Sequence, residues 1–319
     1  MTTARDAFSF ALACAVTVVA GLGVAAQHRV NGELGQRIAD GFTAALVSFS
    51  SGLLILLVAV ALSPRGRAGL RAIRPLVASG GLRWWMLLGG LGGAFMVLGQ
   101  GLVAGILGVA IFTVATVTGQ TAMGLWIDAT GFAGARRSPV SAQRIVGALI
   151  TLVAVAVAVG PELGGRVPFA AIVLPLLAGL GVGMQAAVNG RVREATRSPL
   201  AATTMNFVVG TSALAVATAA HLVVSGPPHA LPSEPWLYLG GALGAVFIAI
   251  QTITVARIGV LVLGLCLVAG QLIGALVFDL VAPIGVPTTA ATAIGAALTL
   301  VGVVIASAPG RRRSPALDG

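Results

Sequence analysis

Long apolar runs of about 20 residues alternate with short polar segments along the whole chain. A helix of about 20 apolar residues is long enough to cross the hydrocarbon core of a membrane. The runs are uniformly apolar, whereas the strands of a membrane β-barrel alternate over about ten residues, so the pattern favours helices. We expect ten transmembrane helices, at 8–27, 42–62, 84–104, 108–128, 144–160, 168–188, 200–223, 236–256, 259–280 and 290–308. The very short third-to-fourth and eighth-to-ninth connections predict helical hairpins.

Composition strengthens the prediction of an all-α integral membrane protein. Mean hydropathy is +1.02 and 9% of the residues are charged, against about 25% in soluble domains. A soluble core could not cover this much apolar surface in 319 residues, so lipid must cover the outside. Cys14 and Cys266 both fall inside apolar runs and are interpreted as small buried hydrophobic residues, not as a disulfide.

The chain contains an internal duplication. Residues 21–32 recur 158 positions later, at 179–190, with eight of twelve positions identical. Further polar and aromatic residues recur in order at an offset of 151, and small and β-branched residues follow at an offset of 148. The pairs at the offset of 151 include Trp85 with Trp236, Gln100 with Gln251, Gln120 with Gln271, and Asp128 with Asp279. We therefore expect a first five-helix repeat at 1–160, a second at 161–310, and a basic cytoplasmic tail at 311–319.

The distribution of charge predicts that the two repeats have opposite orientations. All 19 basic residues are Arg, and the formal net charge is +10. With the N-terminus in the cytoplasm, 16 of them lie on the cytoplasmic side, leaving only Arg29, Arg37 and Arg166 on the other side. This asymmetry follows the positive-inside rule and places both termini in the cytoplasm. Five helices per repeat is an odd number, so the second repeat is inverted. The basic surplus is a topology signal that attracts anionic lipid, not nucleic acid.

Amide side chains within the apolar runs are the main candidates for substrate contact. An unsatisfied amide in hydrocarbon costs several kcal/mol, so these groups must face protein or a wet cavity. Hydrogen bonding between helices is the structural alternative, and inheritance from a common ancestor also explains their symmetric placement. The candidates for the cavity or its gates are Gln27, Asn31, Gln100, Gln120, Gln185, Asn189, Asn206, Gln251 and Gln271.

Asp128 and Asp279 are the only acidic residues attached to helical runs. Each is either a capping or anchoring acid at the membrane interface, or a gate or proton site. No carboxylate lies at mid-depth, which favours a polar neutral or zwitterionic solute over a cation exchanged for protons. The three His residues have no metal-ligand spacing, and no catalytic motif is present. We therefore expect no metal, no cofactor and no enzymatic activity.

Several of these motifs resemble one family. Gln-x-x-Val-Asn-Gly at 27–32 and 185–190, Phe-x-x-Gly at 49–52 and 207–210, and Leu-Gly-Gly at 88–90 and 239–241 resemble the YdcZ family of the drug/metabolite transporter superfamily. So does Gly-Gln followed by Asp at 119–128 and 270–279. The resemblance implies two inverted five-helix repeats around a central cavity. His28 and Arg29 depart from the symmetry, because the second copy has Ala186 and Ala187 there.

These observations predict an alternating-access carrier in a bacterial plasma membrane that moves a small polar metabolite or drug-like solute. Export is expected from the superfamily resemblance alone. The alternatives are a lipid flippase, which predicts a lateral opening lined by Arg, and a non-catalytic membrane partner subunit. The partners expected are the solute and membrane lipid, and a homodimer is left open.

Overall fold

The computed structural model describes residues 4–134, 142–160, 168–284 and 288–307, and every regular element in these residues is helical. The longer helices are α1 (Ala4–Arg37), α2 (Gly41–Leu62), α3 (Pro64–Ala78), α4 (Gly90–Gly99), α6 (Val109–Thr130), α7 (Ala142–Val159), α8 (Phe169–Thr196), α9 (Pro199–Ser225), α10 (Gly240–Val281) and α11 (Ala290–Ser307). The shorter ones are η1 (Trp84–Gly89), the π-helical turn η2 (Gln100–Ala104), α5 (Gly105–Leu107), η3 (Phe132–Gly134) and η5 (Pro235–Tyr238).

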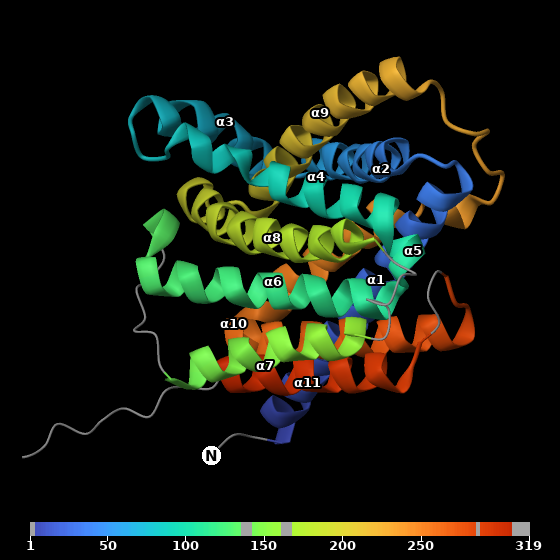
Figure 1. The fold of residues 1–319 in the computed structure, drawn as a ribbon. Helices are drawn as coiled ribbons and strands as arrows, with labels where there is room; N and C mark the ends of the chain where they lie inside the picture. Colours follow the sequence, from blue (N-terminus) through green and yellow to red (C-terminus); the bar gives the residue numbers. More distant parts are fainter. Residues whose placement is uncertain (1–3, 135–141, 161–167, 285–287, 308–319) are drawn as a thin grey trace, which may run out of the picture.

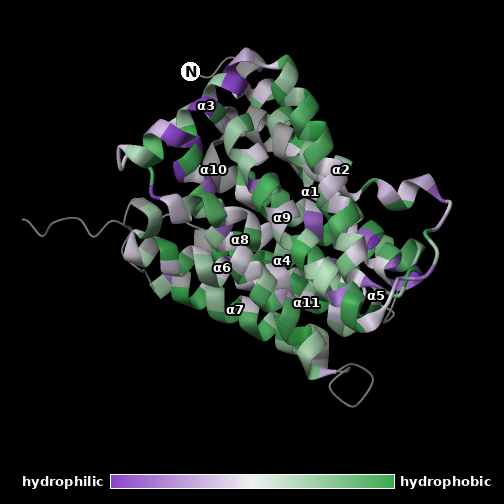
Figure 2. Cartoon of the chain, turned by 90° about the horizontal axis from the view of Figure 1, so that it is seen from above, coloured by the Kyte–Doolittle hydropathy of each residue, from purple (hydrophilic) through white to green (hydrophobic). Residues whose placement is uncertain are grey.

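The helices form one bundle (Figure 1). Along one edge lie α2, α3 and α9, along the opposite edge lie α7 and α11, and α4, α8, α6, α1 and α10 fill the space between. Hydrophobic residues cover much of the outside (Figure 2), including Leu62, Val223 and Val281, which are 79%, 88% and 79% exposed. Large aliphatic side chains at such exposure need lipid around them.

Seven helical stretches in the described residues are long and apolar enough to cross a membrane. They are Phe8–Arg37, Gly41–Leu62, Trp84–Leu107, Val109–Ile127, Phe169–Thr196, Pro199–Ser225 and Leu263–Val281. Two shorter apolar helices, Ile145–Ala158 and Ala290–Ile305, lie at the predicted fifth and tenth positions. The stretch Trp84–Leu107 combines η1, α4, η2 and α5 in one span, and a turn at Gly108 (φ 83°) separates it from α6. This is the first predicted hairpin.

The element α10 is a single helix where two were predicted, yet its contacts show that it reverses direction. Gly240 at its start lies against Asn31, and Asp279 near its end lies within electrostatic reach of Arg29, so both ends approach the same part of α1. A straight helix of 42 residues would instead be about 60 Å long. The element therefore has two antiparallel arms. Its reversal lies between Ile250 and Leu263, which both pack near Ala13 and Ala20.

The segment after α2, predicted as an Arg-rich connection, contains the amphipathic helix α3. Its buried face is made of glycine: a Cβ on Gly69 would lie 2.4 Å from the Ser198 Cβ at the start of α9. Four arginines lie on exposed positions of this helix: Arg65, Arg67, Arg71 and Arg74. A helix with one packed face and one basic face suits the boundary between membrane and water.

Equivalent helices of the two copies each begin with a capping side chain at the same position. The Asp40 carboxylate accepts hydrogen bonds from the backbone N–H groups of Phe42 and Thr43, at 2.9 and 3.3 Å, and caps α2. At the equivalent position 158 residues later, the Ser198 hydroxyl accepts from the Ala201 N–H at 3.2 Å and caps α9. These caps satisfy donors that a helix start leaves unpaired.

Equivalent residues of the two copies also make equivalent contacts with exchanged partners. A Cβ on Gly21 of α1 would lie 2.4 Å from the Leu267 carbonyl oxygen of α10. A Cβ on Gly179 of α8 would lie 2.1 Å from the Thr116 carbonyl oxygen of α6. Position 21 matches 179 at the offset of 158, and 116 matches 267 at the offset of 151. The first helix of each copy thus crosses the fourth helix of the other copy at the closest approach that glycine permits.

Candidate functional site

The two copies meet through a pair of phenylalanines. Phe49 of α2 stacks on Phe207 of α9, with ring centroids 4.8 Å apart and an interplanar angle of 29°. A Cβ on Gly52 would lie 2.4 Å from Phe207 Cε1, and a Cβ on Gly210 would lie 2.3 Å from Phe49 Cε1. Each Phe-x-x-Gly motif therefore supplies one ring and the space for the other. The repeated motif was visible in the sequence, but the contact between its two copies was not.

Of the amides Gln27 and Gln185, which are equivalent in the two copies, Gln185 lies beside this pair. Gln185 Oε1 lies 2.8 Å, and Phe49 Cζ 3.2 Å, from the position a Cβ would take on Gly93 of α4. In the other copy, Gln27 Nε2 lies 3.2 Å from the equivalent position on Gly244 of α10. Both amides are partly exposed, and Gln185 Oε1 is a buried oxygen without a hydrogen-bond partner among the described residues. An unpaired buried acceptor next to partly exposed space is a group that a polar solute can satisfy.

Asn31 and Asn189 each connect three helical segments. Asn31 Nδ2 donates to Gln100 Oε1 at 2.6 Å, and Gln100 is 2% exposed in the π-helical turn η2. Asn189 Nδ2 donates to Asn206 Oδ1 at 3.0 Å. Both Asn Oδ1 atoms also lie against glycine, at Gly240 and Gly89 respectively.

These two asparagines therefore act first as hydrogen-bonding links between helices. Buried acceptors nevertheless remain beside Gly240. Asn31 Oδ1 and Ser48 Oγ have no hydrogen-bond partner in the part of the chain that the structure describes, and Ser48 is the equivalent of Asn206 in the first copy.

Gln120 and Gln271 lie at the two glycine crossings. The backbone nitrogen of Gln271 is 2.9 Å, and that of Gln120 is 3.0 Å, from the Cβ position on Gly21 and Gly179 respectively. Each crossing lies about 9 Å from the nearer of Gln27 and Gln185, measured along α1 or α8. Six helical residues separate Gly21 from Gln27 and Gly179 from Gln185. The structure therefore brings Gln185 to the Phe49–Phe207 pair and Gln27 to the equivalent glycine of α10, and it places Gln120 and Gln271 at the crossings instead.

Asp279 caps a helix of the other copy. Its carboxylate accepts from the N–H groups of Val109 and Ala110, at 3.0 and 2.7 Å, and it is 4% exposed. Gly108, which precedes α6, has no side chain to cap it, so Asp279 supplies the missing acceptor. This geometry matches the capping interpretation. The side chains of its counterpart Asp128 and of Gln251 lie outside the described residues.

His28 was not among the predicted site residues and has no counterpart in the second copy. It is fully buried, with Nδ1 3.1 Å from Thr113 Oγ1 and its ring 5.1 Å edge-on from Phe112. Its Nε2 has no hydrogen-bond partner within the described ranges. The lack of symmetry at 28 and 186 was the only sequence signal for this position.

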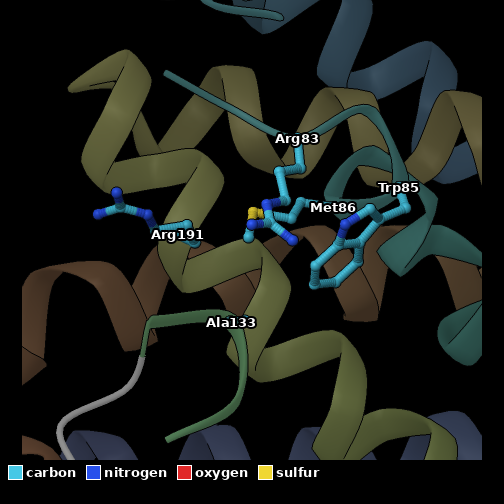
Figure 3. Close-up of a pocket in the computed structure, with 5 residues that line it drawn as sticks. All are labelled: Arg83, Trp85, Met86, Ala133 and Arg191. Atoms are coloured by element: carbon cyan, nitrogen blue, oxygen red, sulfur yellow. The ribbon is translucent and has the colours of Figure 1, made fainter. Parts of the chain in front are cut away.

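The two ends of the bundle differ in charge. At one end, Glu33 forms ion pairs with Arg29 and Arg37, at 2.8 and 2.6 Å, and Arg37 also forms an ion pair with Glu234. The Arg37 guanidinium carbon lies 5.6 Å from the centroid of the Trp236 ring. We call these five residues the Arg37 cluster. At the other end is a pocket of about 310 Å³ lined by Arg83, Trp85, Met86, Ala133 and Arg191, which we call the Arg83 pocket (Figure 3).

Among the described residues, no group of three or more His, Cys, Asp or Glu side chains could hold a metal ion.

Comparisons with known proteins agree on the family and the fold. The family described as "Putative inner membrane exporter, YdcZ" matches residues 12–157 and again residues 170–305. A solved structure described only as "Crystal structure of protein" aligns with a TM-score of 0.56 and 19% identity, over 93% of this chain and 96% of the other. That likeness shows a shared fold alone. No curated protein matches significantly. The two family matches, one to each copy of the duplicated motifs, show that the chain belongs to the YdcZ family of the drug/metabolite transporter superfamily.

Proposed function

We propose that this protein is a secondary-active exporter of a bacterial plasma membrane, which moves a small polar solute by alternating access. The family description supports export across the inner membrane. The observation that carries the mechanism is the exchange of contacts between the copies at Gly21 and Gly179. Exchanged contacts of this kind are typical of carriers in which two related units move around a central site.

The close crossings define the two units. One consists of α1 with the two arms of α10, and the other consists of α8 with α4 and α6. In each unit the backbones touch at glycine: Gly21 meets Gly270, and Gly119 meets Gly179, with no room for a methyl group. Such packing makes each unit rigid, so movement is concentrated between the units. The Phe49–Phe207 pair joins the copies beside Gln185 and forms the pivot.

Polar groups facing the space between the units set the class of solute. Gln27 belongs to the first unit and Gln185 to the second, so a solute bound by both amides would contact both units. Asp279 is occupied with capping α6. Binding through amides, hydroxyls and backbone favours a neutral or zwitterionic solute, and no enzymatic step is required.

The proposed topology has ten transmembrane helices in two inverted repeats, with both termini in the cytoplasm. The seven long apolar stretches, the two shorter helices and the first arm of α10 make up the ten. The basic helix α3 then lies on the cytoplasmic surface, and the Arg37 cluster lies on the opposite surface. This orientation follows from the arginine asymmetry.

Transport in proteoliposomes tests the proposal. A metabolite library is first screened for compounds that raise the melting temperature, because a ligand of the folded state stabilises it. The stabilising compound is then followed in counterflow with Gln27→Ala and Gln185→Ala, and with Leu54→Ala on the lipid-facing surface as the control.

We expect at least a tenfold loss of transport in both Gln variants and none in the control. Normal flux in well-folded Gln27→Ala and Gln185→Ala would refute the amide cavity. The same comparison for Gln120→Ala and Gln271→Ala tests whether the crossing level also contacts the solute. Stabilisation by lipid alone, with lipid moved between leaflets, would favour the flippase alternative.

A further inference from the structure

The symmetry of the fold relates the Arg37 cluster to the Arg83 pocket. At the offset of 158, Glu33 corresponds to Arg191 and Arg37 corresponds to Ala195. At the offset of 151, Arg83 corresponds to Glu234 and Trp85 corresponds to Trp236. The same structural position is thus occupied at both ends of the bundle, but with different charges.

In the Arg37 cluster a guanidinium joins two carboxylates. Arg37 on α1 pairs with Glu33 on the same helix and with Glu234 immediately before η5. It also lies over the Trp236 ring. One cation between two acids and above an aromatic ring links α1 to the segment that leads into α10. The charges of the Arg37 cluster are therefore balanced by its own side chains.

In the Arg83 pocket, arginines stand at both positions that hold the two acids in the Arg37 cluster. The side chain that would correspond to Arg37 is missing. Ala195 takes the place of Arg37 and belongs to the same apolar cluster as Met86 and Trp85. The alanine side chain carries no charge that could join Arg83 to Arg191, and the pocket of about 310 Å³ is lined by both arginines. Figure 3 shows Arg83 and Met86 side by side with the Trp85 ring next to them. Arg191 lies across from them on α8, with its guanidinium directed away from Arg83 and paired with Glu194.

The charge in the pocket is not balanced as it is in the Arg37 cluster. Arg191 pairs with Glu194 at 2.7 Å, but both side chains are exposed, at 40% and 71%, and the pair lies along a single helix. Such exposed pairs exchange readily with solvent and contribute little. No acid of the described residues is placed between Arg83 and Arg191 as Arg37 is placed between Glu33 and Glu234.

We propose that the Arg83 pocket binds an oxyanion, a carboxylate or phosphate group, which takes the bridging place between Arg83 and Arg191 that Arg37 occupies at the other end. Guanidinium groups bind such oxyanions through paired N–H donors. The volume is at the lower limit of small-ligand sites, which suits one small anion or a lipid headgroup. Trp85 and Met86 form the apolar wall. The proposal concerns binding alone and does not depend on transport.

Anion titrations of the purified protein in uncharged detergent test this site. The probes are inorganic phosphate and succinate, each compared with chloride at matched ionic strength, and short-chain phosphatidylglycerol compared with phosphatidylcholine. The melting temperature and the tryptophan fluorescence are both measured. We expect stabilisation by an oxyanion and a fluorescence change that is lost in Trp85→Phe. A response to phosphate or succinate identifies a soluble oxyanion as the ligand, and a response to phosphatidylglycerol alone identifies a lipid headgroup.

Matched variants separate this site from general attraction to a basic surface. Arg83→Gln and Arg191→Gln are each expected to weaken the oxyanion response at least tenfold, and Arg83→Lys less than Arg83→Gln. The control is Arg74→Gln, which removes an exposed arginine from α3 without touching the pocket. The proposal is overturned if Arg74→Gln weakens the response as much as Arg83→Gln, or if none of the anions acts on the wild-type protein.

Discussion

The glycine crossing between α1 and α10 provides a sharp test of the packing on which the mechanism depends. A Cβ on Gly21 would lie 2.4 Å from the Leu267 carbonyl oxygen and 2.9 Å from both Gln271 N and Gly270 Cα. All three are backbone atoms, so no side chain can rotate away. Restoring an ordinary contact of about 3.5 Å requires the helices to separate by about 1 Å. Overpacking of this kind costs about 1–3 kcal/mol.

Gly23, two residues along the same helix, is the matched control, because nothing lies within 4 Å of its Cβ position. In Gly21→Ala the helix-propensity gain of about 1 kcal/mol is outweighed by the clash, so the free energy of unfolding falls. In Gly23→Ala only the gain remains, so stability is unchanged or higher. Thermal unfolding followed by size-exclusion chromatography measures both variants in one detergent. Equal melting temperatures for the two would refute the close crossing, and Gly179→Ala should behave like Gly21→Ala.

Three further results follow from single contacts. Asp279→Ala removes both acceptors that cap α6, so it should lower the free energy of unfolding by about 1–3 kcal/mol, as measured by thermal unfolding. Asp279→Asn keeps one acceptor and should cost less. Equal losses in the two variants would contradict the capping role. Bonds from its own backbone N–H and from Arg37 lower the pKa of Glu234 from its ordinary 4.5. Because the folded-state pKa is lowered, its stabilisation is present above the ordinary pKa and is lost as the pH falls through the lowered value. The melting-temperature difference between wild type and Glu234→Gln should therefore persist at pH 5 and vanish only in stronger acid, and loss by pH 6 would contradict the pairing. Asn31→Leu should destabilise the protein more than Gln100→Leu in the same assay, since only Asn31 also lies against Gly240.

Much of the fold was predictable because membrane helices can be recognised from the length and apolarity of their sequences. The predicted spans at 42–62 and 200–223 match α2 and α9 closely, since a polar capping residue, Asp40 or Ser198, marks the start of each helix. The duplication could also be detected in the sequence, because amides and tryptophans recur in the same order in the two copies. By contrast, α3 was missed as a helix. Its four arginines and two prolines resemble a connection, although Leu70, Ile73, Leu76 and Val77 carry a helical period that could have revealed it.

The site was predictable as a set of residue types but not as an arrangement. Which amides share one level depends on where the helices cross, and the crossings are set by glycines that are too frequent in this chain to be ranked by sequence. Gln185 lies beside the Phe pair and Gln27 lies at the equivalent glycine of α10, while Gln120 and Gln271 lie at the crossings. The partner of Asp279 is 170 residues away on the other copy, so no local pattern could identify it. The change from two acids to two arginines at equivalent positions became meaningful only once the structure placed them at opposite ends.

The central claim is that the two repeats have opposite orientations, and labelling of one matched pair of positions tests it most directly. Ala39 and Arg197 are equivalent at the offset of 158, both are exposed, and both have φ of 52°. Single cysteines are introduced as Ala39→Cys and Arg197→Cys after Cys14 and Cys266 are replaced by alanine. With a membrane-impermeant maleimide on intact cells stripped of their outer envelope, we expect labelling of position 39 alone, and labelling of position 197 only after permeabilisation. Labelling of both positions from the same side would contradict the inverted architecture and the carrier mechanism built on it.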